Sequence, residues 1–545
     1  MSETRSPALH FAALVSSSFS LSKNSADDLM GSALNSCDVR ADLEHLLPIT
    51  EIGEDPSLET LDLVDAAQRL GVDYRFQTEI DLILESHYAI ANSPGDDLHQ
   101  VALRFRLLRQ RGYFVSSDVF KIFMDEEGNF KQGLEQDIKG LMSLYEASQL
   151  CILGEDILEQ AANFSAQILE QYVKNNLNTN QARDVAKTLA NPFHTSFSKF
   201  MVKDYLGTEH HSQATNRWAH AFQQVAKMDF NAAQNMHRQE LLQFTRWWRE
   251  TGLGKVMKFA RDQPLKWYVC SLVCLMGPRF SEERVELSKP ISFVYLIDDM
   301  FDLYGSLHQL TVFTEAVKRW DVATAETLPE CMKICFKSLY EMTNQLSCKI
   351  HQKHGWDPID SLRKSWAKLC DAFLLEAGWF TSGKSPSAEE YLRNGVISSG
   401  VHVVLVHVFF LLGQGINKRT VQLLDSNPEI ISSAATILRL QDDFGSAKDE
   451  NQDGYDGSYV NYYMTDNQEV SIESTRKHIT NLISCAWKTL NRESLLPNNP
   501  FPLAFVEASL NIARFVPVLY GYDENQNLPT LEKLVKSMLY ETVQM

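Results

Sequence analysis

The sequence predicts an all-α protein made of two helical domains. Polar helix-start signals stand before apolar segments at residues 116–118 and 385–390. Strand-like alternation joined by hairpin signals is nearly absent from the chain. The helical period is visible early in the sequence, where apolar residues recur every three to four positions, at Leu61, Val64, Ala67 and Leu70 and again at Val101, Phe105 and Leu108.

The composition is that of a globular protein with room for a large core. The chain has 545 residues, of which 44% are hydrophobic and 22% charged. A formal net charge of −19 argues against a nucleic-acid partner, because neutralising phosphates requires clustered Lys and Arg. It does not exclude an anionic substrate, since metal ions or a few arginines can reverse the local field. We expect a monomer.

The first 55 residues predict a poorly ordered N-terminal tail, which ends in the acidic segment 48–56 with its two prolines. The beginning of this tail is rich in serine, but Glu3, Asp27 and Asp28 depart from the acid-poor signature of a transit peptide. The tail therefore favours the cytoplasm, with the plastid stroma as the alternative.

Two domains are expected after the tail. Asn191–Pro192 should end a helix, and a change of composition follows around residues 205–225. We therefore predict an N-terminal helical domain at 56–225 and a C-terminal domain at 226–545 that contains most acidic clusters. The longest apolar run, at residues 401–412, is shorter than the roughly 20 residues of a membrane helix, so we expect a buried helix and no membrane span.

The first acidic motif follows an apolar segment. Residues 291–297 are mainly apolar, and Asp298, Asp299 and Asp302 come next. On a helix that continues to Tyr304, Asp298 and Asp302 lie one turn apart on the same face. Such partly desolvated carboxylates repel each other, and a divalent cation removes this cost. Mg²⁺ prefers one or two carboxylates together with substrate phosphates and water. A solvated acidic helix end is the alternative interpretation.

A second acidic motif lies further along the chain. Asp442, Ser446 and Glu450 are spaced four residues apart, so their oxygens line one stripe of a helix and can share one cation. Arg439 is one turn earlier, where its guanidinium could pair with a phosphate held by the same metal. The two motifs together favour a site for a metal and a diphosphate.

With both motifs present, the chain resembles plant terpene synthases. That family carries D-D-x-x-D and [N/D]-D-x-x-[S/T]-x-x-x-E, and both patterns are complete here at 298–302 and 442–450. The D-x-D-D box of class II cyclases is absent from the N-terminal half, so ionisation rather than protonation is the expected chemistry. Further matching segments account for most of the chain after about residue 60: Leu63–Ile80, Phe244–Trp248, Arg284–Ser292 and Gly457–Met464.

The resemblance implies a class I terpenoid synthase fold for the C-terminal domain and no separate chemistry for the N-terminal one. It also implies three Mg²⁺ ions, with Mn²⁺ as a substitute. By resemblance Asp298 and Asp302 hold two of these ions, while Asp442, Ser446 and Glu450 hold the third. The prenyl diphosphate substrate would be bound through a set that includes arginines and carboxylates: Arg261, Asp298, Asp302, Arg439 and Asp442.

The chain departs from the family near Arg261. The family has R-x-R there, whereas this chain has Arg261 followed by Gln263, so one of two guanidiniums for the departing diphosphate is replaced by an amide. Either the metal and Arg439 suffice, or weaker diphosphate binding shortens the lifetime of the carbocation. Cyclising monoterpene synthases also carry tandem arginines followed by a tryptophan near the N-terminus. No such pair is present and no tryptophan precedes Trp218, which favours the subfamily with acyclic products.

Aromatic residues are candidates for stabilising the carbocation through their ring faces. We expect Trp267 and Tyr520 in this role, with Tyr295 and Tyr463 as further candidates, and a core role is the alternative for each. Cys270 occupies a position where the family commonly has an aromatic. Separately, Ser and Gly interrupt an apolar helix at residues 397–400 and free backbone carbonyls. The resemblance implies that these carbonyls point into the pocket and could steer a cation or a water, and a glycine required only for packing is the alternative.

The expected reaction is loss of diphosphate from geranyl or farnesyl diphosphate, followed by attack of water on the allylic cation. The products would be linalool or nerolidol. One alternative is an acyclic hydrocarbon such as myrcene, ocimene or farnesene, and another is a non-enzymatic helical scaffold. A chain-elongating prenyltransferase is disfavoured because it would carry a second D-D-x-x-D where this chain has Ser446 and Glu450.

Overall fold

The structure is a computed structural model that describes residues 58–91, 97–197, 202, 217–446, 458–496, 498–521 and 528–543. These residues form α-helices and short 3₁₀-helices and contain no strand, which confirms the all-α prediction. The predicted tail and Glu450 lie outside the described residues, and so do the prolines that end the tail.

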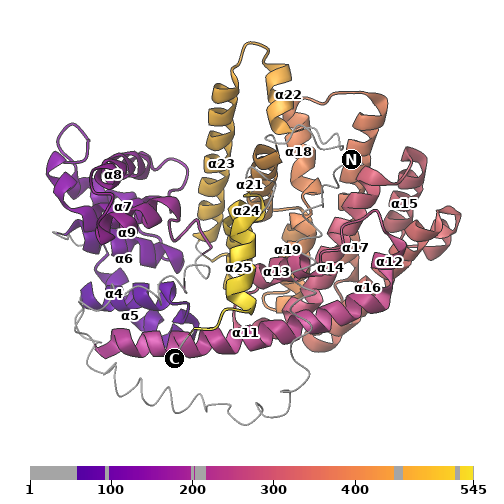
Figure 1. Cartoon of the computed structure of the whole chain (residues 1–545), viewed down its shortest axis with the longest axis horizontal. Helices are drawn as coiled ribbons and strands as arrows, with labels where there is room; N and C mark the ends of the chain where they lie inside the picture. The colour runs from indigo at the N-terminus through magenta and orange to yellow at the C-terminus, as the bar shows by residue number, and fades with distance from the viewer. Residues whose placement is uncertain are drawn as a thin grey trace, which may run out of the picture. The chain divides into compact units, whose positions relative to one another are not determined.

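The chain divides into two compact units. The first contains Met1–His87, Lys199–Gln234 and Gly521–Met545, and the second contains Tyr88–Ser198 and Asn235–Tyr520. The long helix α11, Arg217–Thr251, supplies residues to both (Figure 1). Residue 225, where the sequence predicts a domain boundary, is inside this helix.

The first unit is joined by hydrogen bonds between segments far apart in the sequence. Asp229 on α11 accepts hydrogen bonds from the Tyr74 hydroxyl at 2.6 Å and from Arg75 Nε at 2.8 Å. Gln234 Nε2 donates to the backbone carbonyls of Ser537 at 2.7 Å and Glu541 at 2.8 Å. The helices of this unit, besides the first part of α11, are α4 (Leu58–Arg69), η1 (Asp73–Arg75), α5 (Gln77–Ala89) and α25 (Pro529–Leu539).

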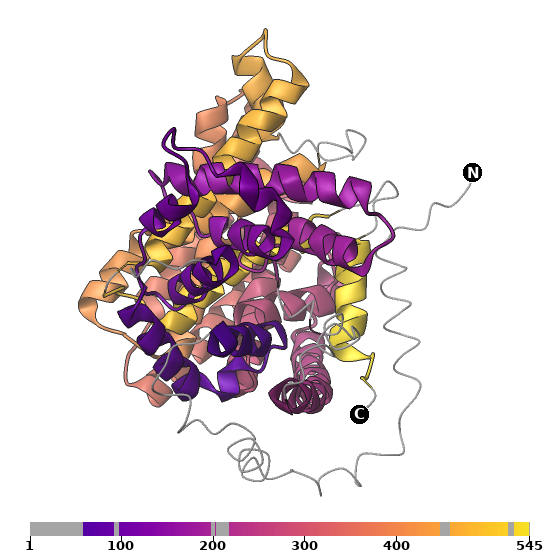
Figure 2. The same ribbon diagram turned by 90° about the vertical axis from the view of Figure 1, so that its left-hand side faces the viewer.

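In the second unit, an early group of helices packs together, and each of its α-helices contacts the next α-helix in the chain (Figure 2). Ser116 caps a 3₁₀-helix at its predicted start signal, and the last helix of the group ends at Ala190, directly before the predicted break. The members are α6 (Leu98–Gln110), η2 (Ser117–Phe123), η3 (Gln132–Gln136), α7 (Ile138–Ser148), α8 (Asp156–Asn175) and α9 (Asn180–Ala190).

The remaining helices of the second unit carry both acidic motifs. Within this group α14 contacts α13, α17 and α19, while α21 contacts α18, α19 and α24 (Figure 1). The members are α12 (Leu253–Val256), α13 (Pro264–Cys274), η6 (Pro278–Phe280), α14 (Ser281–Leu303), α15 (Leu307–Arg319), η7 (Val322–Thr327), α16 (Glu330–His354), α17 (Ile359–Ser382), α18 (Ala388–Ser398), α19 (Val401–Leu412), α20 (Lys418–Asp425), α21 (Glu429–Ser446), α22 (Tyr459–Asp466), α23 (Ile472–Ser494) and α24 (Leu503–Leu519).

A buried ion pair connects α11 to the helices that follow it. Arg284 on α14 is fully buried, and its Nε and Nη2 donate to the Glu240 carboxylate at 2.8 and 2.6 Å. The Tyr268 hydroxyl on α13 donates to the same carboxylate at 2.7 Å. Burial alone would raise the pKa of Glu240, but the hydrogen bonds and charge of Arg284, with a further hydrogen bond from His237, lower it to about 2.

The apolar run at α19 forms part of the core of its unit. Among the described residues, Ala388–Leu412 is the one stretch long and apolar enough to cross a membrane, and 78% of its most apolar window is buried within the protein. His402 and His407 are buried there, and burial lowers the pKa of each to about 4, so both rings are neutral. His402 Nε2 lies 3.0 Å from the Ser365 carbonyl, and His407 Nδ1 lies 2.7 Å from that of Val403.

The predicted interruption before α19 is confirmed. Helix α18 ends at Ser398, and α19 starts at Val401 after Gly400, whose φ of 71° is in the left-handed region. A Cβ atom at Gly400 would come within 2.5 Å of Val294 Cγ1 on α14. Glycine at this position therefore allows both the turn and the close approach of α14.

Candidate active site

The first acidic motif lies in the last turns of α14. Asp298 is half-buried, Asp299 is buried and Asp302 is exposed. The helix ends at Leu303 with Tyr304 as its C-cap, one residue earlier than the sequence predicts. Anions at a helix C-terminus are disfavoured by the helix dipole, so this acidic turn favours binding of a cation.

Asp298 and Asp299 have different partners in the fold. Asp299 Oδ2 accepts the backbone N–H of Arg261 at 2.7 Å, and its Oδ1 pairs with Arg261 Nε at 2.7 Å. Asp298 meets only the guanidinium of Arg261 among the contacts described for it. Burial would lower the pKa of Arg261, but the two aspartates raise it above its usual value. Asp299 thus holds the segment before α13, while Asp298 stays half-exposed.

The second motif repeats this division on α21. Asp442 has 31% of its side chain exposed, whereas Asp443 has 5%. Asp443 accepts the backbone N–H of Tyr459 at 2.8 Å and the Tyr391 hydroxyl at 3.2 Å, which fixes the start of α22. Burial raises the pKa of Asp443 to about 7, although Arg439 opposes this shift. The α21 helix ends at Ser446, whose side chain lies outside the described part of the structure, as does Glu450.

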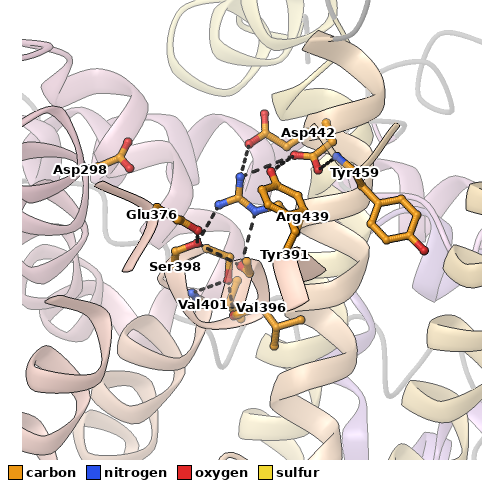
Figure 3. A network of polar contacts seen from close by, with 12 residues as sticks. Asp298, Glu376, Tyr391, Val396, Ser398, Val401, Arg439, Asp442 and Tyr459 are labelled. Carbon is orange, nitrogen blue, oxygen red and sulfur yellow. Dashed lines mark hydrogen bonds and ion pairs between the residues drawn. The ribbon is translucent and has the colours of Figure 1, made fainter. Parts of the chain in front are cut away.

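Arg439 lies at the centre of a polar network (Figure 3). Its Nη1 is 3.9 Å from Asp442 Oδ2 and 3.6 Å from Asp443 Oδ1. Its other nitrogens donate to the Ser398 hydroxyl at 3.2 Å and to the Gly395 carbonyl at 3.4 Å, both on α18. Burial alone would lower the pKa of Arg439, but its acidic neighbours hold it well above the usual value.

Glu376 on α17 is a site residue that the sequence prediction missed. Its Oε1 accepts hydrogen bonds from Ser398 at 2.7 Å and from Asn394 at 2.9 Å. Burial raises the pKa of Glu376, Arg439 lowers it and Asp298 raises it further, so this carboxylate lies within the fields of both acidic motifs. Figure 3 shows Glu376 on the side of Arg439 that faces Asp298. A lone carboxylate in the apolar run 372–380 was the signal that could have identified it.

Tyr295 also connects the two acidic helices. Burial raises the pKa of its phenol, and Asp442 of the second motif and Asp298 of the first raise it further. The Arg261 guanidinium lies 5.1 Å from the ring centroid and Lys266 Nζ lies 5.6 Å from it. Tyr295 therefore lies among the charged groups of the first motif, as Tyr391 does beside Asp443 of the second.

The other aromatic residues predicted for the pocket are Trp267, Tyr520 and Tyr463, and they have different surroundings. Trp267 is fully buried and packs edge-on against Trp248, with ring centroids 4.9 Å apart. It reaches Tyr295 at 6.4 Å, and its indole nitrogen has no hydrogen-bond partner within the described ranges. Tyr520 is the C-cap of α24, a helix in contact with α13 and α21, and Tyr463 stacks on His478 at 4.2 Å.

The described carboxylates fit a metal that also binds a substrate. No group of three or more His, Cys, Asp and Glu side chains in the described ranges is arranged to hold a metal by itself. Asp298 and Asp302 are on one face of α14 and are not buried, and Asp442 is half-exposed on α21. Such sparse carboxylate donors suit Mg²⁺, which retains waters and takes further oxygens from substrate phosphates.

Gly395 allows Arg439 to lie against α18. A Cβ atom at this position would be 3.0 Å from Arg439 Cγ and 3.1 Å from its Nε. Gly395→Ala is therefore expected to displace the guanidinium and to lower kcat/KM for a prenyl diphosphate about tenfold, the loss for one charged contact. Gly378→Ala is the matched control, because a Cβ there meets nothing within 4 Å. Equal kcat/KM for the two variants and wild type would contradict the assigned role of Gly395.

Comparison with known proteins identifies the class. Residues 10–191 match the terpene synthase N-terminal domain, and residues 249–489 match the metal-binding domain of the terpene synthase family. The fold and the site are therefore those of a metal-dependent lyase that acts on prenyl diphosphates.

Individual relatives are similar in sequence or structure to this chain over most of its length. An (E)-nerolidol synthase from Cannabis sativa is 52% identical over 89% of this chain and 89% of its own length. The chloroplastic S-(+)-linalool synthase from Arabidopsis thaliana is 45% identical over 88% and 84% of the two chains. The crystal structure of isoprene synthase from grey poplar, in complex with three Mg²⁺ ions and dimethylallyl-S-thiolodiphosphate, matches with a TM-score of 0.83, 32% identity and coverage of 93% and 96%. The chain belongs to the terpene synthase family.

Proposed function

We propose that the protein ionises geranyl or farnesyl diphosphate and that water captures the allylic cation at its tertiary carbon. The products are then linalool from geranyl diphosphate and nerolidol from farnesyl diphosphate. The observation that carries this proposal is that both acidic helices, α14 and α21, pack on the same helix α19, and that Glu376 lies on the side of Arg439 that faces Asp298 (Figure 3). A scaffold protein has no need to bring two acidic clusters to one part of the fold.

The carboxylates of the two acidic helices are the proposed metal ligands. Asp298 and Asp302 on one side and Asp442, with Ser446 and Glu450, on the other would hold Mg²⁺, with Mn²⁺ as a substitute. When bound, the metal neutralises charge on the diphosphate and makes it a better leaving group.

Arg261 and Arg439 contribute guanidinium groups that pair with the diphosphate oxygens. The ring of Tyr295 presents a negative face to the cation left behind. Trp267 and Tyr520 remain candidates for the same role, although Trp267 is packed on Trp248 in the core.

Acyclic products are supported by the relatives and by the sequence. The Cannabis and Arabidopsis relatives are named for nerolidol and linalool, both acyclic tertiary alcohols. The chain also lacks the tandem arginines with a following tryptophan that cyclising monoterpene synthases carry. Proton loss instead of water capture would give myrcene, ocimene or farnesene as the second candidate outcome.

A plastid is the compartment that the relatives support, because the Arabidopsis relative is named as chloroplastic. Neither of the two sequence relatives is named as cytosolic, so the cytoplasmic expectation gains no support from them. In a plastid, geranyl diphosphate would be the main substrate and linalool the main product.

Purified protein offered geranyl or farnesyl diphosphate with Mg²⁺ is expected to release mainly linalool or nerolidol. Chiral gas chromatography identifies the product and its enantiomer, and a sample with EDTA in place of Mg²⁺ should release none. Release of cyclic products alone would overturn the proposed acyclic outcome. Absence of metal-dependent turnover with both substrates would overturn the proposed substrates.

A further inference from the structure

Two cationic side chains lie over the ring of Tyr295, and within the described residues an anionic partner is found for only one of them. Arg261 is paired with Asp298 and Asp299. Lys266 Nζ lies 5.6 Å from the ring centroid, and its amino group makes no hydrogen bond or ion pair with any residue that the structure describes. Its side chain is nevertheless partly withdrawn from water. An ammonium in this environment is costly unless an anion reaches it.

The surrounding charges show where that anion would sit. Burial lowers the pKa of Lys266 and Arg261 lowers it further, while the Cys270 thiol, Asp442 and Asp299 act in the opposite direction. Lys266 lies beside α14, because its Nζ is over the ring of Tyr295 on that helix, and Asp442 of the second acidic helix acts on its charge. This position between the helices is where a diphosphate bound to the metal ligands would lie.

The helix that carries Lys266 adds to the positive potential. Lys266 lies in the first turn of α13, which contains no acidic residue, and the N-cap residue Gln263 makes no capping hydrogen bond. The backbone N–H groups of a first helical turn lack partners within the helix and favour an anion. A lysine at this end is opposed by the helix dipole, which an anionic ligand would offset.

We propose that the Lys266 ammonium contacts the diphosphate of the substrate and supplies the positive charge that Gln263 does not. This inference rests on the proposed function, because it assumes a diphosphate between the two acidic helices. Lys266 is three residues after Gln263, so a charge lost from the loop before α13 is replaced by one from the first turn of the helix itself. The departing diphosphate is then held by two cations on the α13 side, Arg261 and Lys266.

The test is calorimetric binding of inorganic diphosphate in the presence of Mg²⁺, which needs no turnover. Lys266→Met is expected to weaken binding about tenfold or more, as for the loss of one charge-assisted contact. Lys266→Arg should stay within about threefold of wild type, because it keeps the charge. Adding Gln263→Arg to Lys266→Met should restore most of the lost affinity, which a purely structural role for Lys266 would not explain.

Lys289→Met is the matched control. Lys289 also lies over an aromatic ring, at 5.5 Å from the Trp247 centroid, but it is paired with Glu286 at 2.7 Å. Wild-type affinity is expected for this variant. Diphosphate binding by Lys266→Met within twofold of wild type would overturn the inference, and so would failure of Gln263→Arg to restore affinity to Lys266→Met. Wild-type protein that binds no diphosphate with Mg²⁺ would instead overturn the proposed function, and this inference with it.

Should Lys266→Met fail to fold, Lys266→Gln with and without Gln263→Arg provides the same comparison, because glutamine retains a polar end without a charge. Melting temperatures of all variants are measured alongside. Rescue of affinity without a change in melting temperature supports contact with the diphosphate. A parallel loss of both in every Lys266 variant, arginine included, would assign Lys266 to packing against Tyr295 and overturn the inference.

Discussion

Asp298→Asn is expected to lower kcat for prenyl diphosphate turnover by about 100-fold or more, with little change in melting temperature. In the proposed site this carboxylate would supply charge to a bound cation, and such electrostatic contributions amount to several kcal/mol of transition-state stabilisation. The fold depends on it little, because Asp298 is half-exposed and Arg261 keeps its ion pair with Asp299. Steady-state kinetics over a series of Mg²⁺ concentrations gives both kcat and the metal dependence.

Two further substitutions make this prediction specific. Asp371→Asn removes an exposed carboxylate on α17, paired with Lys318, and should leave kcat unchanged. Asp299→Asn should lower the melting temperature, since it weakens the hold on the backbone of Arg261. If Asp298→Asn retained wild-type kcat and Mg²⁺ dependence, the assignment of Asp298 to the metal would be wrong.

Glu240→Gln is expected to destabilise the protein by about 3–5 kcal/mol, which is the usual cost of removing one partner from a buried ion pair. The substitution leaves the fully buried guanidinium of Arg284 without its counter-charge and weakens the hydrogen bond from Tyr268. Chemical denaturation at pH 7, followed by the far-ultraviolet circular dichroism of the helices, measures the loss. The double variant Glu240→Leu with Arg284→Met should recover part of it, because no unpaired charge remains.

The pH dependence of this contribution has a definite sign. The pKa of Glu240 falls from 4.5 to about 2 in the folded protein, so the unfolded chain binds more protons between these values. The stabilisation is complete above about pH 4.5 and is lost as the pH falls towards 2. The difference in free energy of unfolding between wild type and Glu240→Gln should therefore shrink as the pH falls from about 4.5 towards 2. A difference that is constant from pH 7 to pH 3 would contradict the assignment.

The helical fold and the positions of the acidic helices could be predicted from sequence because their signals are local. Helical spacing places Asp298 and Asp302 on one face whatever surrounds them, and Ser387 caps α18 within the predicted start signal. The start at 385–390 and the break after Ala190 are confirmed for the same reason.

The unequal roles within each pair of aspartates could not be predicted, because they depend on distant partners. Asp299 is held by Arg261, 38 residues earlier in the chain, and Asp443 by Tyr391, 52 residues earlier. Neither spacing nor composition identifies which aspartate faces a loop and which faces water.

The positions of the aromatic residues could not be predicted for the same reason, because they also depend on distant partners. The sequence favours Trp267 over Tyr295 for the pocket, yet Trp267 packs on Trp248 whereas Tyr295 meets the charged groups. Which face of a helix is turned to the site is set by the packing of the neighbouring helices. The metal-ligand roles of all five residues stay predictions: Asp298, Asp302, Asp442, Ser446 and Glu450. For Ser446 and Glu450 the described residues do not include the side chains.

The hydrogen bond from the Arg261 backbone N–H to Asp299 affects which part of Arg261 has to move when a ligand binds. With its main chain fixed at 2.7 Å, the arginine can exchange Asp298 for a phosphate by rotation about its own side-chain bonds. Such rotations take picoseconds to nanoseconds, whereas rearranging a loop takes up to microseconds. If Arg261 binds the diphosphate as proposed, this change of partner requires movement of the side chain alone and no rearrangement of the loop before α13.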